Sequence, residues 1–313
     1  MRVLRSLDEL PRPLPFLVLT IGNFDGVHRG HRRILARVVR QARARRGTAV
    51  ALTFDPHPAR VLGRPVPPLL TTLAQKLALL EAAGLDFALV LPFTRALSRL
   101  SPRQFVEEIV CRRLGTRALY VGSNFRFGHR AAGDVRALRA LARELGFAME
   151  VVPRVKVGGQ TASSTLIRRL LAAGRVRAAA RLLGQPYALT GRIRPGQGRG
   201  GPLGFPTLNL SPEQECLPAR GVYLTETLVG GRLFPSATNV GVRPTFGGAR
   251  LVVESHLLGF ARRLRRGRLE VRFHERLRAE KKFASPAALR AQIARDIRRA
   301  RRFFLRLRRS VRV

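Results

Sequence analysis

A glycine-rich stretch with two histidines stands near the start of the 313-residue chain and reads Gly22-Asn-Phe-Asp-Gly-Val-His-Arg-Gly-His31. It follows an apolar run and precedes a helical pattern, so we expect it at the carboxyl end of a first strand, where open α/β sheets bind ligands. Glycines let backbone approach phosphates, and a helix N-terminus offers free N–H groups. His28 and His31 would share one face of the first turn and donate hydrogen bonds to triphosphate oxygens. The alternatives are helix caps or solvent-facing rings; a metal site through both is not expected, because no third ligand is apparent.

Two further segments place polar side chains after later strands of the same half. In Asp55-Pro-His-Pro58 two prolines fix an irregular loop that could aim His57 into the cleft, although a plain turn is the commoner outcome. Asn124 follows the fourth expected strand. The adjacent Phe125 and Phe127 could stack on a flat ring, although core packing is the commoner role of phenylalanine.

A third segment, Ser163–Arg168, opens an expected helix. Hydroxyls, backbone N–H groups and a guanidinium at a helix start can converge on a phosphate. A simple N-cap role would explain Ser163 and Ser164 but not Arg168. The segment therefore predicts a second set of phosphate contacts for the same site.

The second half carries a glycine loop within Gly191–Leu210, followed directly by Pro206-Thr-Leu-Asn209. Alone, the glycine loop looks like any flexible hairpin. Thr207 and Asn209, however, are oxygen ligands at alternate positions of a strand and can hold a phosphate–Mg²⁺ unit. Glu254 lies in an alternating, otherwise apolar strand, where a lone glutamate usually faces solvent.

These motifs occur in the order found in the bifunctional prokaryotic riboflavin kinase/FAD synthetases, which the chain resembles over nearly its whole length. His28-x-Gly30-His31 is similar to the HxGH signature of the nucleotidyltransferase superfamily. Pro206–Asn209 is similar to the PTAN motif of flavokinases, with Leu208 in place of alanine. The other segments that carry the resemblance are Thr53–Pro58, Val121–Gly128, Gly133-Asp134, Ser163–Arg168, Ala237–Phe246 and Glu254–Leu258.

The resemblance implies one enzyme that phosphorylates riboflavin with ATP to FMN and adenylylates FMN with ATP to FAD and pyrophosphate. In the kinase, Glu254 would take the proton from the riboflavin 5′-hydroxyl, and Mg²⁺ would accompany ATP at Thr207 and Asn209. In the adenylyltransferase, His28 and His31 would act on the ATP phosphates. The other residues implied to bind ATP or flavin are Gly22, Asn23, Phe24, Asp25, Gly26, His57, Asn124, Ser163, Ser164 and Arg168 for the adenylyltransferase, and Gly196, Gly198, Gly204, Phe205, Pro206, Asn239 and Arg243 for the kinase.

The elements that must position these residues fall into two patterns. In the first half, strands alternate with helices, which predicts a doubly wound parallel sheet of the α/β class. From Tyr187 to Phe273, short apolar segments broken by Gly and Pro predict a small antiparallel barrel, and Ser285-Pro286 opens a last helix. We therefore expect an adenylyltransferase domain over 1–184 and a kinase domain over 185–313. The expected strands are 14–21, 48–54, 87–91, 118–121 and 148–152, and the helices between them are 29–46, 73–83, 102–114 and 134–145.

The composition gives a formal net charge of +40, from 59 basic and 19 acidic residues. Only four of the basic residues are lysines, and the arginines are spread along the whole chain. We interpret this as a basic surface without a specific nucleic-acid partner, although Arg262–Arg268 and Arg295–Arg312 are dense enough to bind polyanions. With two distant cysteines, no apolar span and no leader pattern, we expect a cytoplasmic protein with no membrane association.

Three other functions stay open at this level. Only one half of the chain could be active, the first half could adenylylate another phosphate ester, or an arginine-rich protein could bind nucleic acid on a borrowed scaffold. The second of these leaves the barrel unexplained. The third gives no reason for two histidines beside Asn124 and Arg168. The sequence does not indicate an oligomeric state.

Overall fold

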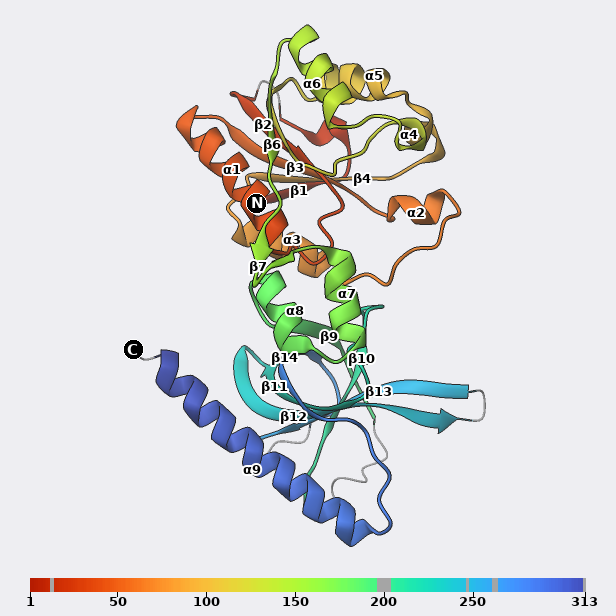
Figure 1. Cartoon of the computed structure of the whole chain (residues 1–313), viewed down its shortest axis with the longest axis vertical. Helices are drawn as coiled ribbons and strands as arrows, with labels where there is room; N and C mark the ends of the chain where they lie inside the picture. Colours follow the sequence, from red (N-terminus) through yellow and green to blue (C-terminus); the bar gives the residue numbers. More distant parts are fainter. Residues whose placement is uncertain (12–13, 196–203, 246–247, 261–263, 312–313) are drawn as a thin grey trace. The chain divides into compact units, whose positions relative to one another are not determined.

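The chain forms two compact units, Met1–Ser164 and Thr165–Val313. Figure 1 shows the first in red to yellow-green and the second in green to blue. In the part of the chain that the structure describes, no helix has both the length and the apolar content needed to cross a membrane. This computed structural model describes residues 1–11, 14–195, 204–245, 248–260 and 264–311.

The first unit is built on a six-stranded parallel sheet in the order β1-β4-β3-β2-β5-β6. From the central β2 the chain builds outward to β3 and β4, and then returns to add β5 and β6 on the other side. The order therefore reverses between β2 and β5, and open α/β sheets bind ligands at the carboxyl ends of strands at such a reversal. The strands are β1 (Arg2–Leu4), β2 (Leu17–Ile21), β3 (Thr48–Phe54), β4 (Phe87–Leu91), β5 (Thr116–Gly122) and β6 (Ala148–Val152).

Helices cover both faces of this sheet, so its central strands are buried on both sides. On one face, α1 (Arg29–Ala44) and α3 (Leu73–Ala82) bury residues such as Leu35 and Leu80 against the strands. On the other face pack α6 (Val135–Glu144) and a π-helical segment, Phe105–Arg113. The shorter elements are 3₁₀ turns at Leu7–Glu9 and His129–Ala131, the helices α2 (Pro58–Val61), α4 (Arg95–Arg99) and α5 (Pro102–Gln104), and a hairpin of β7 (Lys156–Val157) and β8 (Gln160–Thr161).

The doubly wound parallel sheet predicted from the sequence is confirmed, with two differences. The strand β1 was missed, because it has only three residues and one buried side chain, too few to show a pattern. The helix predicted at 102–114 does begin at Pro102, with a capping box between Ser101 and Gln104, but it continues as the π-helical segment.

The second unit is a closed barrel of six antiparallel strands in the order β10-β13-β12-β11-β14-β9, and β9 pairs back onto β10. The helix α8 contacts β14 and β9, and the long C-terminal helix contacts β12. The predicted barrel and last helix are therefore confirmed. The elements are α7 (Ser164–Ala172), α8 (Val176–Leu183), β9 (Tyr187–Arg194), β10 (Leu208–Pro212), β11 (Gly221–Val229), β12 (Arg232–Thr245), β13 (Gly248–Leu257), β14 (Arg268–Arg278) and α9 (Pro286–Val311).

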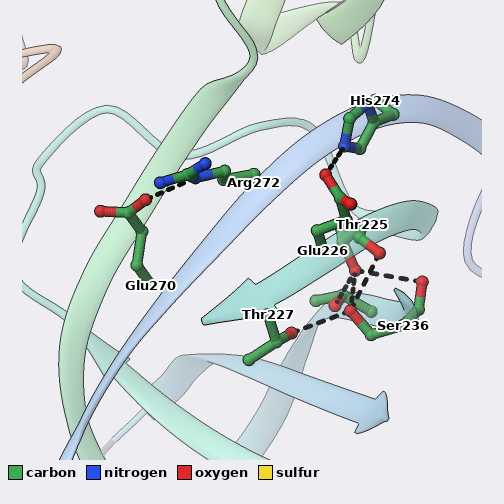
Figure 2. Close-up of polar contacts among 8 residues, drawn as sticks. Thr225, Glu226, Thr227, Ser236, Glu270, Arg272 and His274 are labelled. Atoms are coloured by element: carbon green, nitrogen blue, oxygen red, sulfur yellow. Dashed lines mark hydrogen bonds and ion pairs between the residues drawn. The ribbon is translucent and has the colours of Figure 1, made fainter. Parts of the chain in front are cut away.

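Side chains along the barrel strands alternate between the interior and the outer face, as the pleat of a strand requires. On β11, Tyr223 is fully buried against Phe273 inside the barrel, whereas Leu224 packs outside against Phe304 of α9. Glu226, also outside, lies 2.8 Å from the His274 ring (Figure 2). The hydrogen bond from His274 is the main reason that the pKa of Glu226 lies below its usual value. The outer face of β11 thus packs against α9 and carries the hydrogen bond between His274 and Glu226.

The helices α7 and α8 stand between the two predicted domains in the sequence. By contacts, the chain divides after Ser164, so both helices belong largely to the barrel unit. A functional boundary at residue 184 stays a prediction.

Candidate active sites

The glycine-rich loop connects β2 to α1 at the centre of the parallel sheet. Gly26 has φ +80°, a left-handed conformation that favours glycine. At Gly30, a Cβ atom would lie 3.0 Å from the ring of His28 and 3.6 Å from the carbonyl oxygen of Ala162. The two glycines therefore permit a tight loop in which backbone and imidazole rings lie close together.

His28 is the N-cap of α1, and its Nδ1 accepts hydrogen bonds from the backbone N–H of Gly30 at 3.1 Å and of His31 at 3.4 Å. A ring nitrogen that accepts carries no hydrogen, so the neutral ring holds its hydrogen on Nε2. Burial lowers the pKa of His28 to about 4. His28 is therefore both a cap and a neutral donor through Nε2 at neutral pH.

His31 stacks on His28 with ring centroids 3.7 Å apart and also meets the edge of Phe24 at 5.3 Å. Burial, with smaller contributions from the charges at His28 and Lys76, lowers the pKa of His31 well below its usual value. Both rings are thus neutral at neutral pH. They can donate hydrogen bonds to phosphate, but the positive charge that a triphosphate needs must come from other groups.

A cavity of about 470 Å³ lies at the carboxyl ends of β2, β3 and β5. Five of the predicted site residues line it, and with them stand several aromatic side chains and three arginines that were not predicted. The aromatic side suits a flat ring and the polar side suits phosphate. The predicted lining residues are Gly22, Asn23, Phe24, His31 and Asn124; the added aromatic residues include Phe54, Phe93 and Phe105, and the arginines are Arg64, Arg126 and Arg130.

His57 ends the loop after β3 and reaches the same region. Its Nδ1 accepts from the backbone N–H of Ala59 at 3.2 Å, and its Nε2 lies 3.3 Å from the side-chain amide of Asn23. The sequence left open whether this loop was only a turn. It is a short helix cap that also places His57 against a residue lining the cavity.

Asp25 is turned toward the protein. Its carboxylate accepts from the backbone N–H of Leu70 at 2.9 Å and from Thr71 through both backbone and side chain. Its carbonyl oxygen accepts from the Ser164 hydroxyl at 2.9 Å. These bonds tie the glycine-rich loop to the segment before α3 and to the start of α7, so the observed contacts of Asp25 hold the loop in place. A direct contact between Asp25 and a ligand stays a prediction.

The sequence did not single out Lys76, on α3. Its Nζ donates to the Thr53 hydroxyl at 3.4 Å, and that hydroxyl lies 3.4 Å from the Asn23 carbonyl oxygen. Burial lowers the pKa of Lys76, and the carboxylates of Asp25 and Asp55 oppose this effect. One signal could have found it: Lys76 is one of four lysines in a chain that otherwise uses arginine.

Ser163 and Ser164 stand at the start of α7. Arg168 lies four residues further along that helix, in the second unit, so its predicted approach to the ATP phosphates stays a prediction.

The second candidate site is a row of three polar residues across three barrel strands. Asn209 on β10 pairs in register with Glu254 on β13, which pairs with Asn239 on β12. Residues directly opposite on neighbouring strands point to the same face. The adjacent Leu210 and Val253 are buried inside the barrel, so the three polar side chains lie together on its outer face.

The Pro206–Asn209 segment is fixed to β13. The Pro206 carbonyl oxygen accepts from Nδ1 of His256 at 2.8 Å, and the Phe205 ring meets the His256 ring edge-on at 5.7 Å. Thr207 is half-buried and stands two residues before Asn209, the first member of the row, in this fixed segment. Gly204, at φ +84°, ends the glycine loop. Gly196, Gly198 and the side chain of Arg243 lie outside the described residues.

The two domains together are those of a two-domain transferase of phosphorus-containing groups. Residues 13–166 match the family model of FAD synthetase, and residues 183–304 match that of riboflavin kinase. The chain belongs to the bifunctional riboflavin kinase/FMN adenylyltransferases. It makes FMN from riboflavin with its C-terminal domain and FAD from FMN with its N-terminal domain, as the resemblance had implied.

Curated relatives match over almost the full length. The chain is 37% identical over 307 residues to the bifunctional riboflavin kinase/FMN adenylyltransferase of Escherichia coli K12, covering 97% of this chain and 98% of that protein. The values are 38% over 302 residues for Pseudomonas fluorescens, with 96% and 97% covered, and 32% over 298 residues for Bacillus subtilis, with 93% of each covered. A crystal structure titled as a macrolide-efflux protein from Streptococcus pneumoniae superposes with a TM-score of 0.87 at 24% identity, covering 96% of this chain and 98% of that one, which shows a shared fold.

Proposed function

We propose that the cavity at the carboxyl ends of β2, β3 and β5 is the site of adenylyl transfer. Its aromatic side would hold the isoalloxazine ring of FMN, and the N-terminus of α1 with His31 and Asn124 would face the phosphates of ATP. An oxygen of the FMN phosphate attacks the α-phosphorus of ATP, the bond to the bridging oxygen breaks, and pyrophosphate leaves. The observation that supports this assignment is the cavity itself, which joins the HxGH loop to a flat-ring binding surface.

The histidines act in this proposal as neutral donors. As the bond to pyrophosphate breaks, charge grows on its oxygens, and N–H groups already aimed at them lower the barrier without first having to reorient. His28 can give only Nε2–H, because Nδ1 is occupied by the α1 backbone. Ser163, Ser164 and Arg168 complete the ATP contacts, and Asn23, Asp25 and His57 shape the FMN side.

We propose that the row of Asn209, Glu254 and Asn239 is the kinase site. The Glu254 carboxylate takes the proton of the riboflavin 5′-hydroxyl, and the oxygen attacks the γ-phosphorus of ATP while ADP leaves. The oxygens of Thr207 and Asn209 next to a carboxylate are the hard donors that Mg²⁺ prefers, so these residues fit the ion. When bound, Mg²⁺ would neutralise phosphate charge there.

The domain functions follow from these two sites. We place FMN adenylylation in residues 1–184 and riboflavin phosphorylation in residues 185–313. We also propose a cytoplasmic location, where riboflavin, FMN and ATP are the small-molecule partners, and no specific nucleic-acid partner.

Reciprocal variants test the assignment in the full chain. With riboflavin, ATP and Mg²⁺, chromatography should show FAD from the native protein. His31→Ala should stop at FMN, whereas Glu254→Ala should form no FMN from riboflavin but should still convert supplied FMN to FAD. A loss of both activities in either variant would contradict two separate sites. An unchanged FAD yield from His31→Ala would remove the cavity as the site of adenylyl transfer.

A further inference from the structure

Five hydroxyl side chains close a ring inside the barrel. Figure 2 shows Thr225, Thr227 and Ser236 from β11 and β12 with their hydroxyls pointing toward one another. All five are fully buried. The oxygen–oxygen distances around the ring are Thr225–Thr238 2.6 Å, Thr238–Ser255 2.9 Å, Ser255–Thr227 2.8 Å, Thr227–Ser236 2.8 Å and Ser236–Thr225 2.8 Å.

The ring satisfies its own members. A hydroxyl donates one hydrogen and accepts others, so hydrogens that all point one way around the ring give every member a donor and an acceptor. The Ser236 hydroxyl has the Thr225 carbonyl oxygen, at 3.0 Å, as an alternative acceptor for its one hydrogen. A buried hydroxyl without a partner destabilises a fold, and hydrogen bonds in a closed chain strengthen one another. Valine or alanine would fill this interior without any such geometric demand. What the ring adds is a fixed alignment of β11, β12 and β13, because the five oxygens meet in only one register.

The ring lies directly behind the proposed kinase site. Thr238 pairs in register with Ser255, and their next neighbours, Asn239 and Glu254, pair with each other. Because successive side chains point to opposite faces, Thr238 and Ser255 face the interior where Asn239 and Glu254 face outward. A slip of one residue between β12 and β13 would move the catalytic pair to the wrong face and break the ring at once.

We propose that the part of the hydroxyl ring between β12 and β13, the hydrogen bond of Thr238 to Ser255, positions the kinase site, with these two as positioning residues for Asn239 and Glu254. They touch neither substrate nor reacting atoms. They hold the backbone of β12 and β13 on the interior side, so that the carboxylate meets the riboflavin hydroxyl and the amide stays beside it. This inference rests on the proposed kinase role of Glu254.

The ring supplies its own matched control. Ser255→Ala and Ser236→Ala are the same change, and each removes a buried ring member with two ring neighbours. Ser255 is adjacent to Glu254, whereas the Ser236 hydroxyl contacts the Thr225 and Thr227 hydroxyls and the Thr225 carbonyl oxygen, all on β11. Both variants should lower the thermal midpoint of the barrel. Only Ser255→Ala should lower the kinase kcat, about tenfold, with the KM values for ATP and riboflavin within twofold of native.

A second pair tests the same point on β12. Thr238→Val keeps the shape and loses the hydroxyl, so kcat should fall as in Ser255→Ala, and Thr238→Ser should restore it. All rates are measured on the full chain at a temperature well below the thermal midpoint of the least stable variant. The rate of adenylylation of supplied FMN should be native in every variant.

Two results would overturn the proposal: kcat unchanged in Ser255→Ala and Thr238→Val, or an equal fall of kcat in Ser236→Ala. Glu254→Gln, assayed in parallel, separates this failure from that of the proposed function. If Glu254→Gln loses kinase activity while Ser255→Ala behaves as Ser236→Ala does, only the positioning role is wrong. If Glu254→Gln keeps native kinase activity, the role of the row and the positioning role are both wrong.

Discussion

The two units place their reactive groups by different means. In the first, the polar residues stand on loops at the carboxyl ends of the sheet strands, and hydrogen bonds to backbone N–H groups hold them. His28 caps α1, and Asp25 anchors the segment before α3. In the second, Asn209, Glu254 and Asn239 stand on three strands, and the register of the barrel aligns them. The loop site should therefore be sensitive to local backbone changes and to charge. The strand site should be sensitive to changes in the interactions that fix the register of β10, β12 and β13.

The largest expected effect is on the pH dependence of stability in the loop site. The folded pKa of His28 is about 4 and its ordinary value is 6.5, so between these values the unfolded chain binds a proton that the folded chain does not. Stability from the buried neutral ring is present above pH 6.5 and is lost as pH falls toward 4, up to roughly 3 kcal/mol.

Urea denaturation at a series of pH values measures this effect. The quantity to follow is the free energy of unfolding of the first unit. The control is His28→Asn, because asparagine also caps helices but does not titrate. Its free energy of unfolding should depend less on pH between 6.5 and 4. Equal slopes in the two proteins would show that His28 is not held neutral.

The next effect is steric. Gly30→Val would place a branched side chain against the His28 ring and the Ala162 carbonyl, and the imidazole would have to move. A misplaced catalytic group can cost about 100-fold in rate, so FMN adenylylation should fall by about that factor while riboflavin phosphorylation stays native. Arg33→Val, at an exposed position of the same helix, controls for the helix propensity of valine. A comparable loss of FMN adenylylation in Arg33→Val would show that the loss comes from a less stable α1 instead.

A smaller effect is expected at Lys76. Lys76→Met removes a cation that helps keep the pKa of His31 low, so that pKa should rise. The acid limb of the FMN adenylylation rate should then move to higher pH, and kcat on that limb should fall by less than about tenfold, because burial, the larger cause of the low pKa, remains. Lys76→Arg keeps the charge and should keep the native limb. A limb that does not move in Lys76→Met would mean that Lys76 only supports packing.

How much of these sites the sequence could predict follows from the same contrast. His28, Gly30 and His31 lie within four residues, and strand, turn and helix signals around them are local, so the loop site was predictable. The partners of Asp25, Leu70 and Thr71, are 45 and 46 residues away, and no local pattern connects them. The aromatic side of the cavity likewise combines distant residues: Phe54 at the end of β3, Phe93 after β4 and Phe105 at the start of the π-helical segment.

In the barrel, alternation predicted strands and the resemblance supplied Glu254, but neither could predict the hydroxyl ring. Thr225 and Ser255 read as ordinary residues of two strands. Thr225 and Thr238 lie on paired strands, but Thr227 and Ser255 lie on β11 and β13, which are not neighbours in the sheet and meet only across the barrel interior. Register is a tertiary property, so residues that act through it are visible only in the folded chain.

The smallest expected effect tests the strand site at a contact with the loop that precedes β10. His256→Phe keeps the ring beside Phe205 but removes the hydrogen bond to the Pro206 carbonyl, so the segment with Thr207 is held less firmly. The kinase KM for ATP should rise about threefold with little change in kcat, since the net value of one partly exposed hydrogen bond is small. His256→Asn keeps a hydrogen-bond donor but loses the ring. Its KM for ATP should lie between those of the native protein and of His256→Phe. If His256→Phe instead lowered kcat more than Ser255→Ala, the strand site would depend on its loop as the first site does, and the contrast between the two units would not hold.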